Sequence, residues 1–255
     1  MSGPVVTSTR RAAHGPPPRR RPLRVSVIGF VGELLLTAGV LLGLFVVWQL
    51  FWTDVEASRD QQEAVEQIQE SFTPPPAEPD PGPRTGAPPV MNAPAHGGDF
   101  GLLYVPRWGE DYQLPIAEGD DLPVLNEGAA GHRPGTAMPG EVGNFALAGH
   151  RQTYGAAFHH IDQLETSDRI IVWTKEAWLV YRVTDSYIVA SDQTEVVAPV
   201  PGEPGAEATD RMITLITCHP LWSTAERWIV HGELVEWYPP SDPGDGLPEP
   251  LREGG

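Results

Sequence analysis

Three side chains with complementary chemistry stand at the ends of strand-like segments. Cys218 is the only cysteine among 255 residues and ends a β-branched, apolar run over residues 212–217. Arg227 follows nine residues later at the start of another strand-like run, and His150, 68 residues before the cysteine, ends a third. Because strand ends meet at the edge of a sheet, a thiol, an imidazole and a guanidinium in these places predict a thiol-dependent transferase site.

The chemistry of such a site follows from the three side chains. A thiolate is a strong nucleophile, so Cys218 could attack a carbonyl carbon and hold the acyl group as a thioester. His150 could protonate the departing amine and later take a proton from the incoming one. Arg227 carries a fixed charge and several donors, so it could stabilise the oxyanion or hold the substrate carbonyl. Because a thioester reacts readily with amines, transfer is favoured over hydrolysis.

The remaining polar side chains have simpler interpretations. His219, beside the cysteine, could tune the thiol but is interpreted as a loop histidine. The acidic turn at residues 118–121 could hold calcium but is interpreted as a solvated loop, and no metal or cofactor is expected. Neither one cysteine nor the spacing of the histidines supplies a zinc ligand set. The other candidate histidines are expected to be structural or solvated: His132, His159, His160 and His231.

Charge divides the chain into a basic start and an acidic remainder. Six of the 17 Lys and Arg residues are arginines within residues 1–24, where no acid occurs, and the other 11 face 34 acidic residues. This balance argues against nucleic acid or an anionic wall polymer as the bound ligand. The arginines could form a nucleic-acid-binding arm, but a hydrophobic segment follows at once. They are therefore interpreted as the cytoplasmic flank of a membrane span.

Residues 25–52 form a long apolar segment that is predicted to be a transmembrane signal-anchor helix. The 19 residues after Glu33 span about 28 Å as a helix, which matches one bilayer core. Glu33 then lies at the cytoplasmic interface, and Trp48 and Trp52 lie at the opposite one, where aromatic side chains gather. A cleaved signal peptide fits less well, because the apolar run is long and no small-residue cleavage site follows. The N-terminus is thus expected in the cytoplasm and everything after Trp52 outside.

Composition divides the exported part further. Residues 53–96 are expected to be a juxtamembrane helix, over residues 53–72, followed by a Pro-rich linker that extends as a semi-rigid spacer. Residues 97–240 are one domain long and are predicted to be catalytic. Residues 241–255 are rich in Pro, Gly and acid and are expected to be a disordered tail.

The domain over residues 97–240 is predicted to be all-β. Short β-branched and aromatic runs alternate with Gly and Pro clusters, as in a closed barrel or a sandwich. One short helix is expected at residues 157–164, and Lys175-Glu176 suggests a hairpin. The predicted strands cover residues 102–105, 144–148, 169–173, 177–183, 187–190, 212–217 and 228–237.

The motifs around the three chemical residues resemble the sortase family. The matching segments are Leu147-Ala148-Gly149-His150-Arg151, Thr214-Leu215-Ile216-Thr217-Cys218, and Arg227 at the head of the last strand. The runs over residues 135–140 and 144–155 are similar to class E sortases of high-GC Gram-positive bacteria. The resemblance covers residues 100–240 and implies a closed eight-stranded β-barrel with short helices. The predicted architecture is therefore this barrel, preceded by a single transmembrane helix and a Pro-rich stalk.

The resemblance also implies a membrane-anchored cysteine transpeptidase, with Cys218, His150 and Arg227 as catalytic residues. Such an enzyme cuts a C-terminal sorting signal of a secreted protein between Thr and Gly and joins the Thr carbonyl to an amine of a peptidoglycan precursor. Class E members favour Leu-Ala-X-Thr-Gly over Leu-Pro-X-Thr-Gly. The candidate substrate-binding residues are Thr217, Met138, Tyr154 and Arg133, the last standing where class E members frequently carry Tyr.

Two other functions compete with this hypothesis. A pilin-polymerising sortase would accept a protein lysine in place of the wall amine, but such enzymes commonly carry a lid that plugs the thiol. The Pro- and Gly-rich stretch before Phe100 has no convincing lid anchor. A non-catalytic exported binding module is the other alternative, and the complete set of Cys, His and Arg argues against it.

Overall fold

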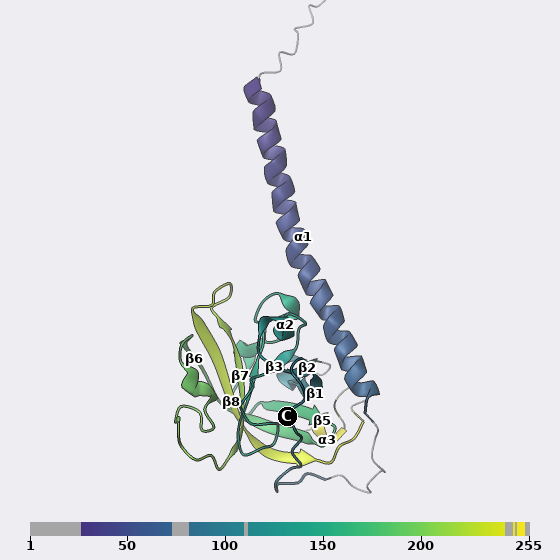
Figure 1. Ribbon diagram of the computed structural model, residues 1–255, viewed down its shortest axis with the longest axis vertical. Coiled ribbons are helices and arrows are strands. Elements are labelled where there is room, and N and C mark those ends of the chain that lie inside the picture. Colours follow the sequence, from purple (N-terminus) through teal and green to yellow (C-terminus); the bar gives the residue numbers. More distant parts are fainter. Residues whose placement is uncertain (1–26, 73–81, 110–111, 243–246, 248, 253–255) are drawn as a thin grey trace, which may run out of the picture. The chain divides into compact units, whose positions relative to one another are not determined.

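The computed structural model describes residues 27–72, 82–109, 112–242, 247 and 249–252. The predicted basic arm over residues 1–24 lies outside these residues. The chain divides into two compact units, residues 1–46 and residues 47–255. The long helix α1 (Val27–Glu70) contributes to both units, and Figure 1 shows it as one uninterrupted helix.

The first half of α1 is the candidate membrane span. In the described part of the chain, one helical segment is long and apolar enough to cross a membrane. This segment is Val27–Gln49, with 23 residues. The helix then continues through the predicted juxtamembrane segment to Glu70. No Gly or Pro occurs between Gly43 and Glu70, so nothing in the sequence breaks the helix there.

The last turns of α1 pack against the barrel. Val65 and Ile68 are buried in an apolar cluster that includes Trp173, and the Phe72 ring meets the Trp173 ring edge-on at 5.1 Å. The Gln61 Nε2 atom donates to the carbonyl of Gly128 at 2.9 Å. The part of the helix that was predicted to be juxtamembrane is therefore an outer layer of the barrel domain.

The predicted linker also differs from a free spacer. Arg84 forms an isolated antiparallel bridge with Trp237, with N–O distances of 2.8 and 2.9 Å. Its guanidinium carbon lies 5.0 Å from the centre of the Trp237 ring, and the Trp237 indole donates to the Gly86 carbonyl. From Arg84 onward the linker therefore follows the barrel, because Pro-rich backbone can still pair at a strand edge. The extended-spacer prediction is wrong for these residues, and residues 73–81 lie outside the described part.

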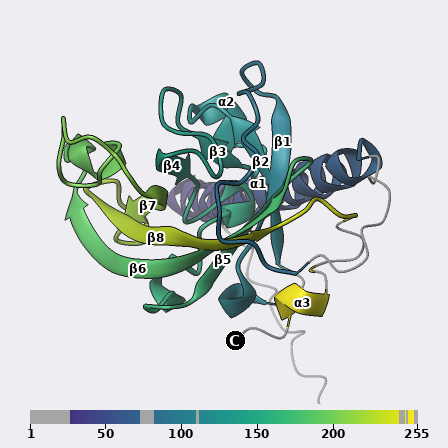
Figure 2. The ribbon, with the colours of Figure 1, turned by 90° about the horizontal axis from the view of Figure 1, so that it is seen from below.

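The domain predicted to be catalytic is a closed eight-stranded barrel, as the resemblance implies, with the strand order β1-β2-β3-β4-β7-β8-β6-β5. Figure 2 shows the two longest strands, β6 and β8, curving side by side. The strands are β1 (Asp99–Tyr104), β2 (Gln113–Glu118), β3 (Ala130–His132), β4 (Gly143–Ala148), β5 (Arg169–Thr174), β6 (Trp178–Ala190), β7 (Arg211–His219) and β8 (Glu226–Tyr238). The short helices and 3₁₀ turns are α2 (Leu122–Leu125), α3 (Glu249–Arg252), η1 (Pro106–Trp108), η2 (Tyr154–Ala156), η3 (Ile161–Gln163) and η4 (Thr194–Val197).

Four elements differ from the sequence predictions. Strands β2 and β3 were not predicted, because β2 contains Pro115 and β3 is only three residues long. The two strands predicted at residues 177–183 and 187–190 form the single strand β6. The helix predicted at residues 157–164 is wrong, since only the 3₁₀ turn η3 forms there. Ala156, just before it, has a positive φ of 44°, which an α-helix does not allow.

Alternating side chains of the central strands fill the barrel. Phe145, Leu147, Ile213 and Leu215 point inward from β4 and β7 and are at most 1 % exposed. Strand β8 adds Val230 to the same cluster. With a period of two, the residues between them face outward. This alternation fixes which side chains of β4, β7 and β8 are available to the site.

A second apolar cluster lies on the outside of the barrel, where α1 packs. Trp173 and Trp178 meet Leu247 and Leu251, which are 3 % and 1 % exposed. Both indole N–H groups donate to Ser241, one to its carbonyl and one to its hydroxyl. The disordered tail predicted for residues 241–255 is therefore wrong for Leu247 and α3, because two leucines four residues apart give the segment an apolar side to bury.

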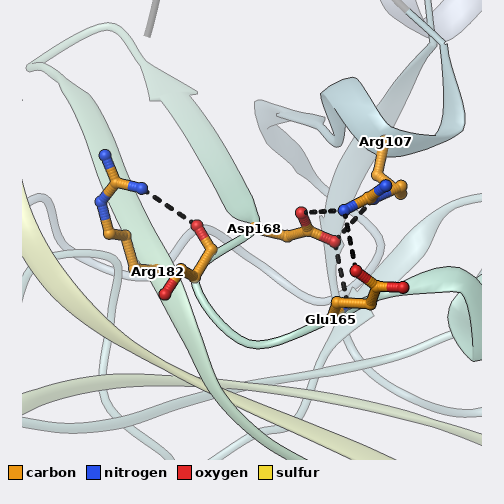
Figure 3. Close-up of polar contacts among 5 residues, drawn as sticks. Arg107, Glu165, Asp168 and Arg182 are labelled. Carbon is orange, nitrogen blue, oxygen red and sulfur yellow. Dashed lines mark hydrogen bonds and ion pairs between the residues drawn. The ribbon is translucent and has the colours of Figure 1, made fainter. Parts of the chain in front are cut away.

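An ion pair ties the turn after β1 to the turn before β5 (Figure 3). Arg107 donates from Nε and Nη2 to the two oxygens of Asp168 at 2.8 and 2.7 Å. Burial alone would raise the pKa of Asp168, but donation from Arg107 and from the Glu165 amide outweighs burial and lowers the pKa. The neighbouring Arg182 donates to the carbonyl of Ser167.

Candidate active site

The registers of three neighbouring strands bring the predicted chemical residues to one end of the barrel. Strands β4 and β7 are parallel, with Ala148 paired to Ile216. The Gly149 amide donates to the Ile216 carbonyl at 3.1 Å, so the pairing continues beyond β4. Extending this register by two residues along both strands places His150 opposite Cys218.

Arg227 reaches the same place from the other side of β7. Strands β7 and β8 are antiparallel, and Cys218 is the direct partner of Arg227 in their register. Directly opposed residues of an antiparallel pair project to the same side of the sheet. The fold thus brings together the thiol, the imidazole and the guanidinium that the sequence predicted.

The thiol lies on the outer side of the barrel wall. Ile213 and Leu215 point into the core, and Thr217 continues this inward set, with 2 % exposure. Cys218 therefore faces outward, and it is partly exposed at the end of β7. It is a free cysteine, and its thiol forms no hydrogen bond within the described residues. The thiol is thus accessible.

His150 is held in one tautomer by a residue that sequence reasoning missed. Its Nε2 lies 2.9 Å from Oδ1 of Asn126, the residue that caps the C-terminus of helix α2. An amide oxygen only accepts, so Nε2 carries the proton and Nδ1 keeps its lone pair. Burial lowers the pKa of His150, which favours the neutral ring. No described residue bonds Nδ1, so this nitrogen can take up and return a proton.

Arg227 is anchored by one end of its guanidinium. Its Nη1 donates to the carbonyls of Thr224 and Glu226, each at 2.9 Å. These two bonds use both protons of Nη1 and fix the plane of the group. Nε and Nη2 bond no described residue and can donate to a substrate oxygen. The side chain is partly exposed, so a peptide on the outer side of β7 could reach it.

The four predicted substrate-binding residues do not gather at one place. Met138 and Thr217 are buried, at 6 % and 2 % exposure, and the Thr217 hydroxyl donates to the Gly149 carbonyl. Tyr154 lies beside the site, with its ring centre 5.4 Å from that of His150. Arg133 pairs with Asp120 at 2.7 Å. As placed here, Tyr154 is the best located of the four, and Met138 and Thr217 support the wall from within.

The carboxylates of the acidic turn, considered above as a calcium site, bond to neighbouring residues of the chain. Glu118 lies 2.6 Å from Nδ1 of the buried His132. Asp121 lies 2.9 Å from His96 and accepts from the Val124 amide at the start of α2. Within the described residues no group of three His, Cys, Asp or Glu side chains could hold a metal ion.

A second polar cluster lies along the middle of the same strands. His231 of β8 is 4 % exposed, with Nε2 2.7 Å from the Tyr187 hydroxyl and Nδ1 2.8 Å from the Thr214 hydroxyl. Burial lowers the pKa of His231 to about 4, although nearby Asp185 acts in the other direction. Beside it opens a cavity of about 360 Å³ that Asp185 and Tyr187 help to line.

The cluster continues to the segment between β6 and β7. The Thr214 hydroxyl donates to Oδ1 of Asn144 at 2.6 Å, and Nδ2 of Asn144 donates to the carbonyls of Val196 and Ala198. Because the Thr214 hydroxyl gives its one proton to Asn144, Nδ1 of His231 must donate to the Thr214 oxygen. Burial lowers the pKa of His231 and favours the neutral ring, in which Nε2 accepts from the Tyr187 hydroxyl. Both of its ring nitrogens are used, so His231 has no nitrogen left for chemistry.

An eight-stranded barrel with a free thiol, an imidazole and a guanidinium at one strand edge defines a thiol-dependent acyl transferase. A model of the sortase domain matches residues 103–235. The chain belongs to the sortase family, whose members are cysteine transpeptidases.

Individual relatives place the chain more closely. It is 35% identical to sortase SrtE2 of Streptomyces coelicolor over 228 residues, which cover 85% of this chain and 86% of the relative. Among solved structures, a sortase from Actinomyces oris is 46% identical with a TM-score of 0.60, over 66% of this chain and 95% of that one. Sortase E1 of S. coelicolor, solved with a tripeptide in its active site, is 38% identical with a TM-score of 0.53, over 63% of this chain and 99% of that one. These similarities support assignment to class E.

Proposed function

We propose that Cys218 is the nucleophile that cleaves a C-terminal sorting signal between Thr and Gly. Its sulfur attacks the Thr carbonyl carbon, and the thiol proton passes to Nδ1 of His150. When the tetrahedral intermediate collapses, the bond to the Gly nitrogen breaks and a thioester remains. The single observation that carries this proposal is the register that sets His150, Cys218 and Arg227 at one end of three adjacent strands.

His150 handles the proton in both halves of the reaction. In the first half, protonated Nδ1 donates to the departing Gly amine. In the second, Nδ1 accepts a proton from the incoming amine as the new amide forms and the thiolate leaves. The bond from Nε2 to Asn126 supports these roles, because it keeps Nδ1 as the titrating nitrogen throughout.

Arg227 stabilises the oxyanion. Two carbonyls anchor Nη1, so the side chain is ordered before substrate binds and the remaining donors stay available. Donors that are fixed in advance stabilise a developing negative charge without reorganising.

The substrates are secreted proteins with Leu-Ala-X-Thr-Gly or Leu-Pro-X-Thr-Gly signals, and the acceptor is an amine of a peptidoglycan precursor. Similarity to class E relatives supports this choice. The alternative acceptor, a protein lysine, belongs to enzymes that commonly carry a lid. The described residues 84–98 bond to the far end of β8 and to Glu118 of β2, and not to Cys218.

We further propose a single-pass membrane protein with its N-terminus in the cytoplasm and residues 97–240 outside. The apolar helix Val27–Gln49 supports the anchor, and the arginines before it support the orientation. Protease added to intact protoplasts should then degrade the barrel. Full protection of the barrel, together with an accessible N-terminus, would reverse the topology.

Turnover of signal peptides tests the function. The full chain in detergent should release the Gly fragment from both signal peptides, faster from Leu-Ala-X-Thr-Gly, and should join the rest to a Gly-based amine. Faster transfer to a lysine side chain would favour pilin polymerisation. No cleavage of either peptide would leave only a binding module.

A further inference from the structure

The residues that follow the two reacting side chains are joined to each other. Arg151 follows His150, and His219 follows Cys218. The Arg151 Nη1 atom lies 2.8 Å from Nδ1 of His219, although the two residues are 68 positions apart. A direct side-chain link thus spans the ends of β4 and β7, one residue beyond the proposed nucleophile and its base.

The guanidinium of Arg151 is enclosed. The side chain is 5 % exposed, and its Nη2 lies 3.4 Å from the exposed Asp162. The guanidinium carbon lies 5.0 Å from the centre of the Trp228 ring, which also meets the His219 ring edge-on at 5.2 Å. Trp228 is the strand partner of Thr217, so this contact joins β4, β7 and β8. A buried cation between an indole and an imidazole holds one defined geometry.

The link also fixes which ring nitrogen of His219 carries the proton. A guanidinium only donates, so Nδ1 of His219 must accept and the ring proton sits on Nε2. Nε2 is 3.9 Å from the Glu226 carboxylate, too far for a hydrogen bond. His219 therefore adjoins the nucleophile with its lone pair already occupied. This arrangement excludes it from acting as the base and leaves that role to His150.

We propose that Arg151, acting through His219 and Trp228, is a positioning residue that sets the distance between the Cys218 thiol and His150. The proposal rests on the proposed function of these two residues. Strand β7 stays paired with β8 as far as His219, but its ladder with β4 ends at Ala148, apart from the bond from the Gly149 amide to the Ile216 carbonyl. Beyond that point the Arg151–His219 link joins the two segments. Arg151 touches no reacting atom. It acts by keeping two chain segments in register.

The consequence is a selective loss of the chemical step. If the link is lost, the thiol and the imidazole can separate, and a misplacement of about 1 Å costs roughly 100-fold in rate. A bound signal contacts the outer side of β7, whereas the alternation of side chains turns Arg151 and His219 away from it. Peptide affinity should therefore change little.

The key experiment compares two substitutions of His219. In His219→Asn, the amide oxygen takes the place of Nδ1 and can accept from Arg151, whereas His219→Leu offers no acceptor. Single-turnover acylation by a Leu-Ala-X-Thr-Gly peptide is measured on the full chain at several peptide concentrations. We expect the saturated rate of His219→Leu to fall ~10- to 100-fold, with half-saturation changed less than about threefold. His219→Asn should recover most of that rate.

Arg151→Met tests the other half of the link. Methionine keeps an unbranched apolar stem against Trp228 and loses the donors. It should lower the saturated rate as much as His219→Leu, and the double variant should be no slower than the slower single one. If Arg151→Met fails to fold, the two His219 variants still decide the proposal.

A matched control is Arg107→Met, which removes a guanidinium from the ion pair with Asp168 (Figure 3). It should lower the melting temperature and leave the acylation rate unchanged. Equal rates for His219→Asn and His219→Leu, or a wild-type rate for Arg151→Met, would overturn the positioning role. In both of these outcomes the wild-type chain still forms the thioester, so only the positioning role fails. A wild-type chain that forms no thioester would instead contradict the proposed function.

Discussion

Polar side chains at the ends of the strands leave hydrogen-bonding atoms unused, whereas polar side chains in the middle of the same strands use all of theirs. At the end, His150 uses one ring nitrogen, Arg227 uses one of three guanidinium nitrogens, and Cys218 bonds no described residue. In the middle, His231 and Thr214 have every bond satisfied. Burial lowers the pKa of both histidines. The difference teaches that reactivity here depends on bonds left open at the strand ends, more than on residue type or burial.

Removing the thiol should have the largest effect. Cys218→Ala should abolish thioester formation and turnover, because no other cysteine exists in the chain. The melting temperature should stay close to that of the wild type, since the side chain is partly exposed and packs no core position. Transpeptidation at the wild-type rate by the alanine variant would show that the strand ends do not carry the reactive group.

Arg227 should give the next largest effect. Arg227→Ala should lower the saturated acylation rate by ~10²- to 10³-fold, which is the cost of losing an oxyanion donor. Arg227→Lys should lower the same rate by less. An ammonium cannot reproduce the planar pair of donors. Single-turnover kinetics across peptide concentrations check this. If only half-saturation changes, Arg227 grips the signal without stabilising the oxyanion.

A substitution in the middle of the strands should act on stability instead. Asn144→Ala leaves two carbonyls and the Thr214 hydroxyl without their partner, which should lower the free energy of unfolding by about 2 to 4 kcal/mol. Denaturant unfolding measures this. The acylation rate should fall less than in Arg227→Ala. A rate loss as large as that of Arg227→Ala, without loss of stability, would show that this cluster belongs to the chemistry.

Acid should lower the free energy of unfolding by protonating His231 in the middle of the strands. Its folded pKa of about 4 lies below the unfolded value of about 6.5, so the unfolded chain takes up the proton first as pH falls. The free energy of unfolding should therefore be highest above about pH 6.5 and decrease toward pH 4, by an amount on the order of 2 to 3 kcal/mol from this residue. In His231→Gln the decrease should be smaller. His150 contributes with the same sign, so the difference between the two proteins isolates His231.

Local residue patterns predicted an all-β domain and its three chemical residues, whereas the choice of a closed eight-stranded barrel over a sandwich came from the resemblance to sortases. Runs of β-branched and aromatic residues predicted β4, β7 and β8, and the three chemical residues stand at the ends of these runs. Short β3 and the Pro-containing β2 carry too little pattern to be found.

Contacts between distant segments could not be predicted in this way. Asn126 has no motif around it, and it reaches His150 only because α2 ends beside the site. Arg151 and His219 adjoin the chemical residues, so their positions were a signal, but the bond between them depends on the strand register. The packing of α1 and of Leu251 on the barrel likewise needs the folded surface, which composition does not specify.

The most direct test of the account is the mass of the intact full-length protein after mixing with a Leu-Ala-X-Thr-Gly peptide. We predict that the mass increases by that of the Leu-Ala-X-Thr acyl group and that peptide mapping finds this group on Cys218. A Gly-based amine should then remove it as the transfer product. An unmodified mass after the peptide has been cleaved, or an acyl group on another residue, would contradict the account.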